Sequence, residues 1–238
     1  MEKIIYVLQR DPAINIEEYS RRLRHILAER LRKLGAHGVQ VNVADHAVAP
    51  AAGLRQGPTR PPPEAVLNIW IDSAIAKRRQ PVDEAIAEFS PVFWAYLVTE
   101  SVPVRNTGHP PKPGARTEGF AQMAFLRLPQ RLGYDAWLDM WQNTHTDVAI
   151  ETQSGFEYVQ NIVVRRLSGE GPQFVAIVEE CFPEGAMNDY RMLFDAPDDD
   201  EKFKRNLRRM MESVNRFIDA DTVDIIPTSQ YVIFTPWR

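Results

Sequence analysis

The stretch YDAWLDMWQNTHTDVAIETQSGFEYVQNIVVR, residues 134–165, joins a helical pattern to a strand pattern and guides the interpretation of the rest of the chain. Trp137, Trp141 and His145 are spaced four residues apart, so they stack along one face of the predicted helix. A helix buries such a stripe against a core. The following run, residues 156–164, is rich in β-branched and aromatic residues and predicts a strand.

The two halves of the chain repeat one order of elements. In the first half, strand patterns lie at residues 4–8, 39–43, 66–71 and 98–104, and helical patterns at 16–34 and 82–97. Pro91 should kink or divide the second helical pattern. In the second half, strand patterns lie at 120–128, 156–165, 174–182 and 229–234, and helical patterns at 134–151 and 198–218. Each half therefore has the strand–helix–strand–strand–helix–strand order of a ferredoxin-like domain.

A segment rich in proline and glycine separates the halves. Residues 106–119 read NTGHPPKPGARTEG, which is typical of a linker. We therefore predict an N-terminal half at 1–106, a linker at 107–119 and a C-terminal half at 120–238. A sheet covered by helices on one face must bury its other face. We expect an α+β fold in which two tandem ferredoxin-like domains pack as an intramolecular dimeric α+β barrel. Two independent domains on a flexible linker are the alternative.

Composition excludes several classes of protein. The 238 residues include 28 basic and 32 acidic residues, so the net charge of −4 argues against a general nucleic-acid binder. The single cysteine, Cys181, rules out a disulfide within the chain. The opening MEKIIYVLQRDP has too short an apolar run for a signal-peptide core, and no run approaches the ~18 apolar residues of a membrane span. We expect a cytoplasmic protein without a membrane or nucleic-acid partner.

The candidate catalytic residues are His145 and Tyr158. An imidazole titrates near neutral pH and suits proton transfer, while Trp137 and Trp141 would exclude water and stack on an aromatic substrate. The alternative is a histidine hydrogen-bonded inside the core. Tyr158 shares a strand face with Gln160, and its hydroxyl could donate to a developing enolate oxygen. Asn161 lies on the opposite face unless a bulge turns it.

Two charged residues complete the predicted site. Arg127 ends its strand and could hold a substrate carboxylate, although a surface ion pair is the simpler interpretation. Glu179 and Cys181 share one strand face and Glu180 lies on the other. One of the two carboxylates could be a second acid/base group, and we assign Glu179 to substrate binding. Five scattered histidines and one cysteine do not form a metal-ligand pattern.

These residues resemble the EthD family of the dimeric α+β barrel superfamily. The resemblance rests on Arg127, on Trp137, Trp141 and His145 of the helix, and on Tyr158-x-Gln160-Asn161 of the next strand. The opening KIIYVLQR, residues 3–10, is similar to the first strand usual in that family. Related barrels include cofactor-free cyclases, monooxygenases, decarboxylases, isomerases and haem peroxidases, so the resemblance alone does not set the chemistry.

The first half departs from the family pattern. Leu23 and Leu27 stand where the second half has Trp141 and His145. The sequence therefore predicts one pocket per chain, in the second half.

We predict an enzyme that needs no cofactor and acts on a small aromatic or polyketide-like compound through proton transfer by His145. The favoured class is a lyase that cleaves C–C or C–O bonds or decarboxylates. A cofactor-free monooxygenase, cyclase or isomerase and a non-catalytic small-molecule binder are the alternatives. Haem held by His145 is a less favoured option. The barrels could also pair as a homodimer.

Overall fold

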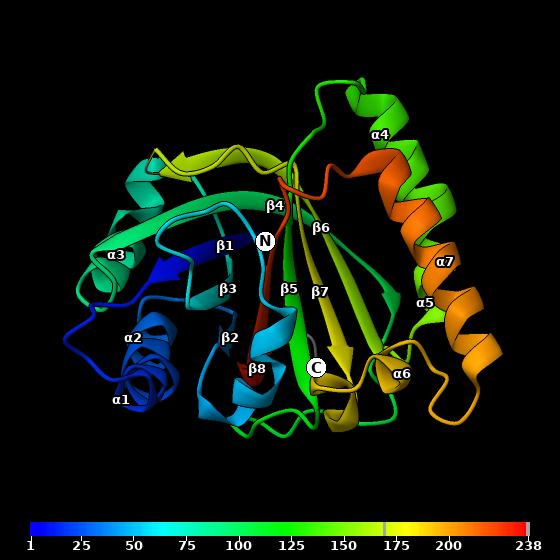
Figure 1. The fold of residues 1–238 in the computed structure, drawn as a ribbon. Coiled ribbons are helices and arrows are strands. Elements are labelled where there is room, and N and C mark those ends of the chain that lie inside the picture. Colours follow the sequence, from blue (N-terminus) through cyan, green and yellow to red (C-terminus); the bar gives the residue numbers. More distant parts are fainter. Residues whose placement is uncertain (169, 237–238) are drawn as a thin grey trace.

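The protein forms one closed antiparallel barrel with helices outside it. The computed structural model describes residues 1–168 and 170–236. In those residues eight strands close in the order β1-β3-β2-β8-β5-β7-β6-β4, and β4 pairs with β1. Figure 1 shows the helices of the first half on one side of the barrel and those of the second half on the other. The predicted α+β barrel is confirmed.

The first half supplies four neighbouring strands and the helices that cover their outer face. Its strands are β1 (Glu2–Gln9), β2 (Gly38–Val43), β3 (Ala65–Ile71) and β4 (Val92–Val104). Its helices are α1 (Ile16–Arg21), a π-helical segment (Arg22–Leu27) that continues into α2 (Ala28–Lys33), a 3₁₀ segment (His46–Leu54) and α3 (Ala76–Ala87). Asn15 caps α1 by accepting from the Glu18 backbone N–H at 2.8 Å.

The second half repeats this arrangement. Its strands are β5 (Phe120–Leu126), β6 (Glu157–Ser168), β7 (Ala176–Phe182) and β8 (Asp224–Phe234). Its helices are α4 (Tyr134–Met140), a π-helical turn (Trp141–His145) that continues into α5 (Thr146–Thr152), a 3₁₀ turn (Glu184–Met187), α6 (Tyr190–Leu193) and α7 (Asp200–Phe217). Asp199 caps α7 by accepting from the Lys202 backbone N–H.

Pairing across the halves closes the barrel. Strand β2 pairs with β8, and β4 pairs with β6 along most of its length. The two halves therefore share one continuous sheet, and the alternative of two independent domains is wrong. The predicted linker is also tied down, because the backbone N–H groups of Gly114 and Thr117 donate to carbonyls of β8 at 2.8 and 2.9 Å.

Each strand sends alternate side chains into the barrel and out to the helices. An apolar cluster that includes Ile5, Val66, Phe125 and Ile177 fills part of the interior. The opposite faces of the strands pack on the helices of their own half, which makes one outer core on each side of the barrel.

One helix is shorter than the sequence predicts. The predicted helical pattern at 82–97 divides at Pro91, because α3 ends at Ala87 and β4 begins at Val92. Phe93 and Leu97 lie on the outer face of that strand against the first-half core. The region predicted as a loop at 49–64 also carries part of the 3₁₀ segment.

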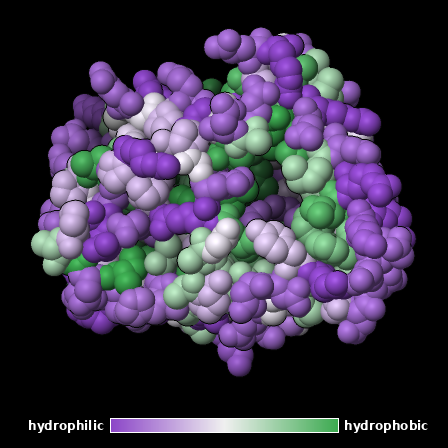
Figure 2. Space-filling model, in the orientation of Figure 1, coloured by the Kyte–Doolittle hydropathy of each residue, from purple (hydrophilic) through white to green (hydrophobic). Residues whose placement is uncertain are grey.

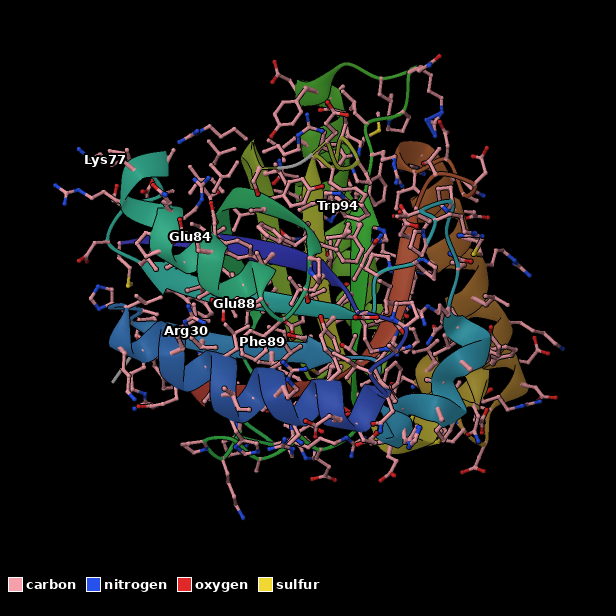
Figure 3. The ribbon with its side chains drawn as sticks, turned by 90° about the vertical axis from the view of Figure 1, so that its left-hand side faces the viewer. Arg30, Lys77, Glu84, Glu88, Phe89 and Trp94 are labelled. Atoms are coloured by element: carbon pink, nitrogen blue, oxygen red, sulfur yellow. The ribbon has the colours of Figure 1, made fainter. Side chains whose placement is uncertain are left out.

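The helices of the first half are joined at their outer surface. Figure 3 shows Arg30 of α2 beside Glu88 at the end of α3. The Arg30 guanidinium donates to the Glu88 carboxylate at 2.8 Å. This exposed pair stabilises the fold only slightly. The neighbouring Phe89 is 7% exposed and packs into the core. None of the described helices is both long and apolar enough to cross a membrane.

We expect Phe125→Ala to lower the free energy of unfolding by about 3–5 kcal/mol, because Phe125 is fully buried in the barrel interior. Its ring lies 5.1 Å from that of Phe174. Urea unfolding monitored by circular dichroism measures the loss. Val164→Ala on the exposed part of β6 is the control, with an expected change within about 0.5 kcal/mol. A loss below about 1 kcal/mol for Phe125→Ala would contradict this view of the interior.

Candidate functional site

A cavity of about 320 Å³ lies between the outer sheet face of the second half and its helices. Its floor comes from β5 to β8, its walls from the π-helical turn and α7. Figure 2 shows apolar surface in a hollow right of centre, over the elements that enclose this cavity. The polar and aromatic side chains that line it are Gln56, Gln122, Trp141, His145, Gln153, Tyr158, Glu180, Asn215 and Phe217.

The two tryptophans hold one wall of the cavity. Trp141 lines it directly, and Trp137 stacks behind Trp141 at a ring separation of 5.3 Å. Trp137 is fully buried and does not line the cavity. The π-helical turn that contains Trp141 and His145 adds a residue to one turn of the helix, a feature common at functional sites.

His145 is buried beside α7. Its Nδ1 lies 3.0 Å from the Ser213 hydroxyl, and its ring lies 4.6 Å from that of Phe217. Burial lowers the pKa of His145 to about 4, so the imidazole is neutral at neutral pH. A neutral imidazole has one N–H donor and one acceptor nitrogen.

Tyr158 and Gln160 face the helices, as predicted for one strand face. The Trp141 indole N–H donates to the Tyr158 hydroxyl at 3.2 Å. The side chains of Gln160 and Thr146 also hydrogen-bond this hydroxyl. Gln160 donates to the Thr146 hydroxyl at 2.8 Å and supports the wall without lining the cavity. Burial raises the pKa of Tyr158, so it remains a phenol. Asn161 lies in the barrel interior, where it donates to the Ile177 carbonyl at 3.0 Å.

Glu180 is the carboxyl group of the cavity. It lies directly opposite Tyr158 across the β6–β7 ladder, which brings the two side chains onto one face. Burial raises the pKa of Glu180 to about 7, and a hydrogen bond from Gln122 opposes part of that rise. The sequence signal for Glu180 is an acidic residue on a strand face otherwise made of Ala176, Val178 and Phe182.

Glu179 lies on the other face of the sheet, inside the barrel. Gln40 and Asn42 of β2 and Gln230 of β8 donate to its carboxylate at 2.7–2.9 Å. Glu157 lies beside it, and burial followed by the charge of Glu179 raises the pKa of Glu157. The structure therefore separates Glu179 from His145, which the sequence interpretation had grouped together.

Arg127 is also held away from the cavity. Its guanidinium lies 2.9 Å from the buried carboxylate of Asp224 and donates to the hydroxyl of Thr59 at 2.9 Å. Its planar head packs over the Phe174 ring at 4.8 Å. These contacts describe a buried ion pair that fastens β8 to the loop before β3.

Part of the lining carried no signal in the sequence. Met210, Met211 and Val214 of α7 close the apolar side of the cavity. Gln56 comes from the first half, and its backbone pairs with Ile225 of β8 in the second half. Their types resemble those of ordinary core or loop residues, so only the assembled fold reveals them.

In the first half, Leu23 and Leu27 are fully buried in the outer core at the places that correspond to Trp141 and His145.

The cavity does not suit haem. No lysine or arginine is found among the described residues that line it, so the two propionates would lack partners. Across residues 1–168 and 170–236, there is no group of three or more His, Cys, Asp or Glu side chains placed to hold a metal ion.

Comparison with solved structures agrees on the fold. An anthrone oxidase-like protein superposes with a TM-score of 0.58 at 14% identity, over 99% of this chain and 94% of that one. A dye-decolorizing peroxidase from Bacteroides thetaiotaomicron matches with a TM-score of 0.45 at 9% identity, over 97% and 93% of the two chains, too distant to support an argument. No protein-family model and no curated protein match the sequence. The chain therefore shares its closed antiparallel barrel fold with the anthrone oxidase-like protein.

We expect Glu180→Gln to stabilise the protein at pH 8 but not at pH 4. The raised pKa means that the folded state keeps a proton that the unfolded chain releases above pH 4.5. Stability is therefore lost as the pH rises from 4.5 to about 7, by up to about 3 kcal/mol. Urea unfolding of both proteins at several pH values measures the difference. An equal effect of the substitution at pH 4 and pH 8 would contradict this origin.

We expect the His145 ring to titrate with a midpoint near 4 in the folded protein, because burial penalises the imidazolium. The effect of His145 on stability has the opposite pH dependence to that of Glu180, because at acidic pH the unfolded chain binds a proton that the folded protein does not. The stability of the folded protein is therefore unaffected by this ring above pH 6.5 and falls as the pH drops from 6.5 toward 4. NMR titration of the ring carbons, repeated in urea, measures both states. A folded midpoint near 6.5 would show that the ring is solvated.

Proposed function

We propose that the chain is an enzyme without a cofactor that binds a small aromatic or polyketide-like molecule in the cavity. Glu180 moves the proton, and the neutral ring of His145 supplies a hydrogen bond. The observation that carries this proposal is the placement of Glu180 opposite Tyr158 across the β6–β7 ladder, which brings a carboxyl and a phenol together in a largely apolar cavity. Burial raises the pKa of that carboxyl to about 7. A base with a pKa near the working pH is effective in proton transfer. We further propose that the two halves are tandem ferredoxin-like domains, as the strand order of each half suggests.

The carboxylate of Glu180 takes a proton from an acidic C–H or O–H group of the substrate. Negative charge then develops on a carbonyl or phenolic oxygen. The Tyr158 hydroxyl, which accepts from the Trp141 indole N–H, donates a hydrogen bond to that oxygen. The neutral ring of His145 supplies a second hydrogen-bonding group, positioned by Ser213.

Lyase chemistry is the reaction class that we propose first. With a β-hydroxy ketone, Glu180 takes the hydroxyl proton and the neighbouring C–C bond breaks. The electron pair of that bond forms an enolate with the ketone carbonyl. Glu180 then returns the proton to the α-carbon of the enolate. The products are an aldehyde and a ketone, and the enzyme returns to its starting state. Trp141 offers an aromatic surface along which such a substrate can stack.

We expect Glu180→Gln to slow release of the aldehyde from a naphthyl β-hydroxy ketone by about 10²–10⁴-fold, because the amide cannot take a proton. Tyr158→Phe and His145→Ala should each slow it by a factor of about 10–10³. Fluorescence of the aldehyde gives the rate. In the unmodified protein the rate should rise with pH to a plateau above about 7, as Glu180 ionises. Unchanged rates in all three variants would refute the mechanism.

A cofactor-free oxygenation is the second candidate, and the similarity to an anthrone oxidase-like protein favours it. The same deprotonation would give a substrate anion that reacts with oxygen directly. Anthrone and O₂ would yield anthraquinone and water, so the atoms balance without a further reductant.

An oxygen electrode separates the two reactions. We expect the lyase reaction to proceed at the same rate under argon and to consume no oxygen. Consumption of one O₂ per anthrone by the protein, lost in Glu180→Gln, would instead establish the oxygenation. Anthrone oxidises slowly by itself, so a protein-free sample is the control.

A further inference from the structure

The charge of the cavity wall is one-sided. Among the described residues that line it, Glu180 is acidic and no lysine or arginine is present. The other polar groups are the amides of Gln56, Gln122, Gln153 and Asn215, with the aromatic groups described above. An anionic ligand would thus enter a low-dielectric space without a cationic partner.

Three arginines near the cavity are engaged in ion pairs. Each lies within 3.2 Å of a carboxylate of its own, and these carboxylates belong to β8, to the turn after α7 and to α5. The three pairs are Arg127–Asp224, Arg131–Asp219 and Arg209–Glu151. Arg131 is tied further, because it donates to the Asn215 carbonyl at 2.9 Å. Recruitment of any of them to a bound anion would break an existing ion pair.

His145 does not supply the missing cation either. It is buried against Phe217, it is hydrogen-bonded to Ser213, and no carboxylate contacts its ring among the described residues. The imidazolium would have no counter-charge there, so the ring remains neutral above about pH 5.

We propose that the cavity selects uncharged aromatic molecules such as phenols and aryl ketones, that it rejects aromatic carboxylates, and that Glu180 determines this selection. This inference rests on the proposed function only in taking the cavity as the substrate site. It narrows the chemistry, because decarboxylation would require binding of a carboxylate substrate. Cleavage of C–C or C–O bonds in a neutral molecule remains.

Two ligands with the same ring system test the selection. We expect isothermal titration calorimetry at about pH 8 to show 2-naphthol binding at least about tenfold more tightly than 2-naphthoate. At about pH 5.5 the naphthoate is still ionised while Glu180 is protonated, so its affinity should rise about tenfold. The affinity for 2-naphthol should change little.

The pH change acts through Glu180 alone in this cavity. Tyr158 of β6 remains a phenol and His145 remains neutral across the range. The described lining from β5, β8 and α7 contributes no group that titrates there. Glu180→Gln should therefore bind naphthoate equally well at both pH values. Glu212→Gln, on the exposed side of α7, makes the same change in net charge and should retain the pH dependence.

Naphthoate binding at pH 8 as tight as that of naphthol would overturn the selection, and so would the absence of naphthol binding. Retention of the full pH dependence in Glu180→Gln would show that another group selects. These results are separate from those for catalysis. If naphthol binds selectively but all the catalytic variants turn over at the same rate, the selection stands and the proposed mechanism fails.

Discussion

The alternation of side chains across a closed sheet determines what every polar residue of this protein can do. In β7 it sends Glu179 into the barrel and Glu180 out to the helices, although the two are neighbours in the chain. A shift of one residue in the register would exchange them. Hydrogen bonds from Gln40 of β2 and Gln230 of β8 to the Glu179 carboxylate oppose that shift. The inner network thereby fixes which carboxyl reaches the cavity.

Burial shifts the pKa values of Glu180 and His145 in opposite directions. It favours the neutral form of each, so the pKa of Glu180 rises to about 7 and that of His145 falls to about 4. The carboxyl becomes the group that changes charge near neutral pH, and the imidazole becomes a fixed hydrogen-bonding group. This reverses the roles expected from the ordinary pKa values of the two side chains. It also costs stability, which is common where a site is built for chemistry rather than for folding.

Most of the fold was predictable because period and order are local properties. The spacing of Trp137, Trp141 and His145 places them on one helical face, and the two-residue period places Tyr158 and Gln160 together. The choice between Glu179 and Glu180 was not predictable, because the barrel interior is partly polar and both strand faces carry an acid. The end of α3 was misjudged because the apolar residues after Pro91 continue a helical spacing by chance. The α7 residues that line the cavity form an ordinary apolar helical stripe, so the sequence predicted the helix but could not distinguish a cavity wall from a packed core.

The backbone bridge between Gln56 and Ile225 holds a loop of the first half against the cavity of the second half. The first half has leucines in place of Trp141 and His145, yet its Gln56 still lines the cavity of the second half. Changes in the segment around residue 56 can therefore alter which molecules fit, while the residues that perform the chemistry stay the same. The loop around residue 56 is therefore a place where substitutions can change ligand preference while the strands and their inner network stay intact.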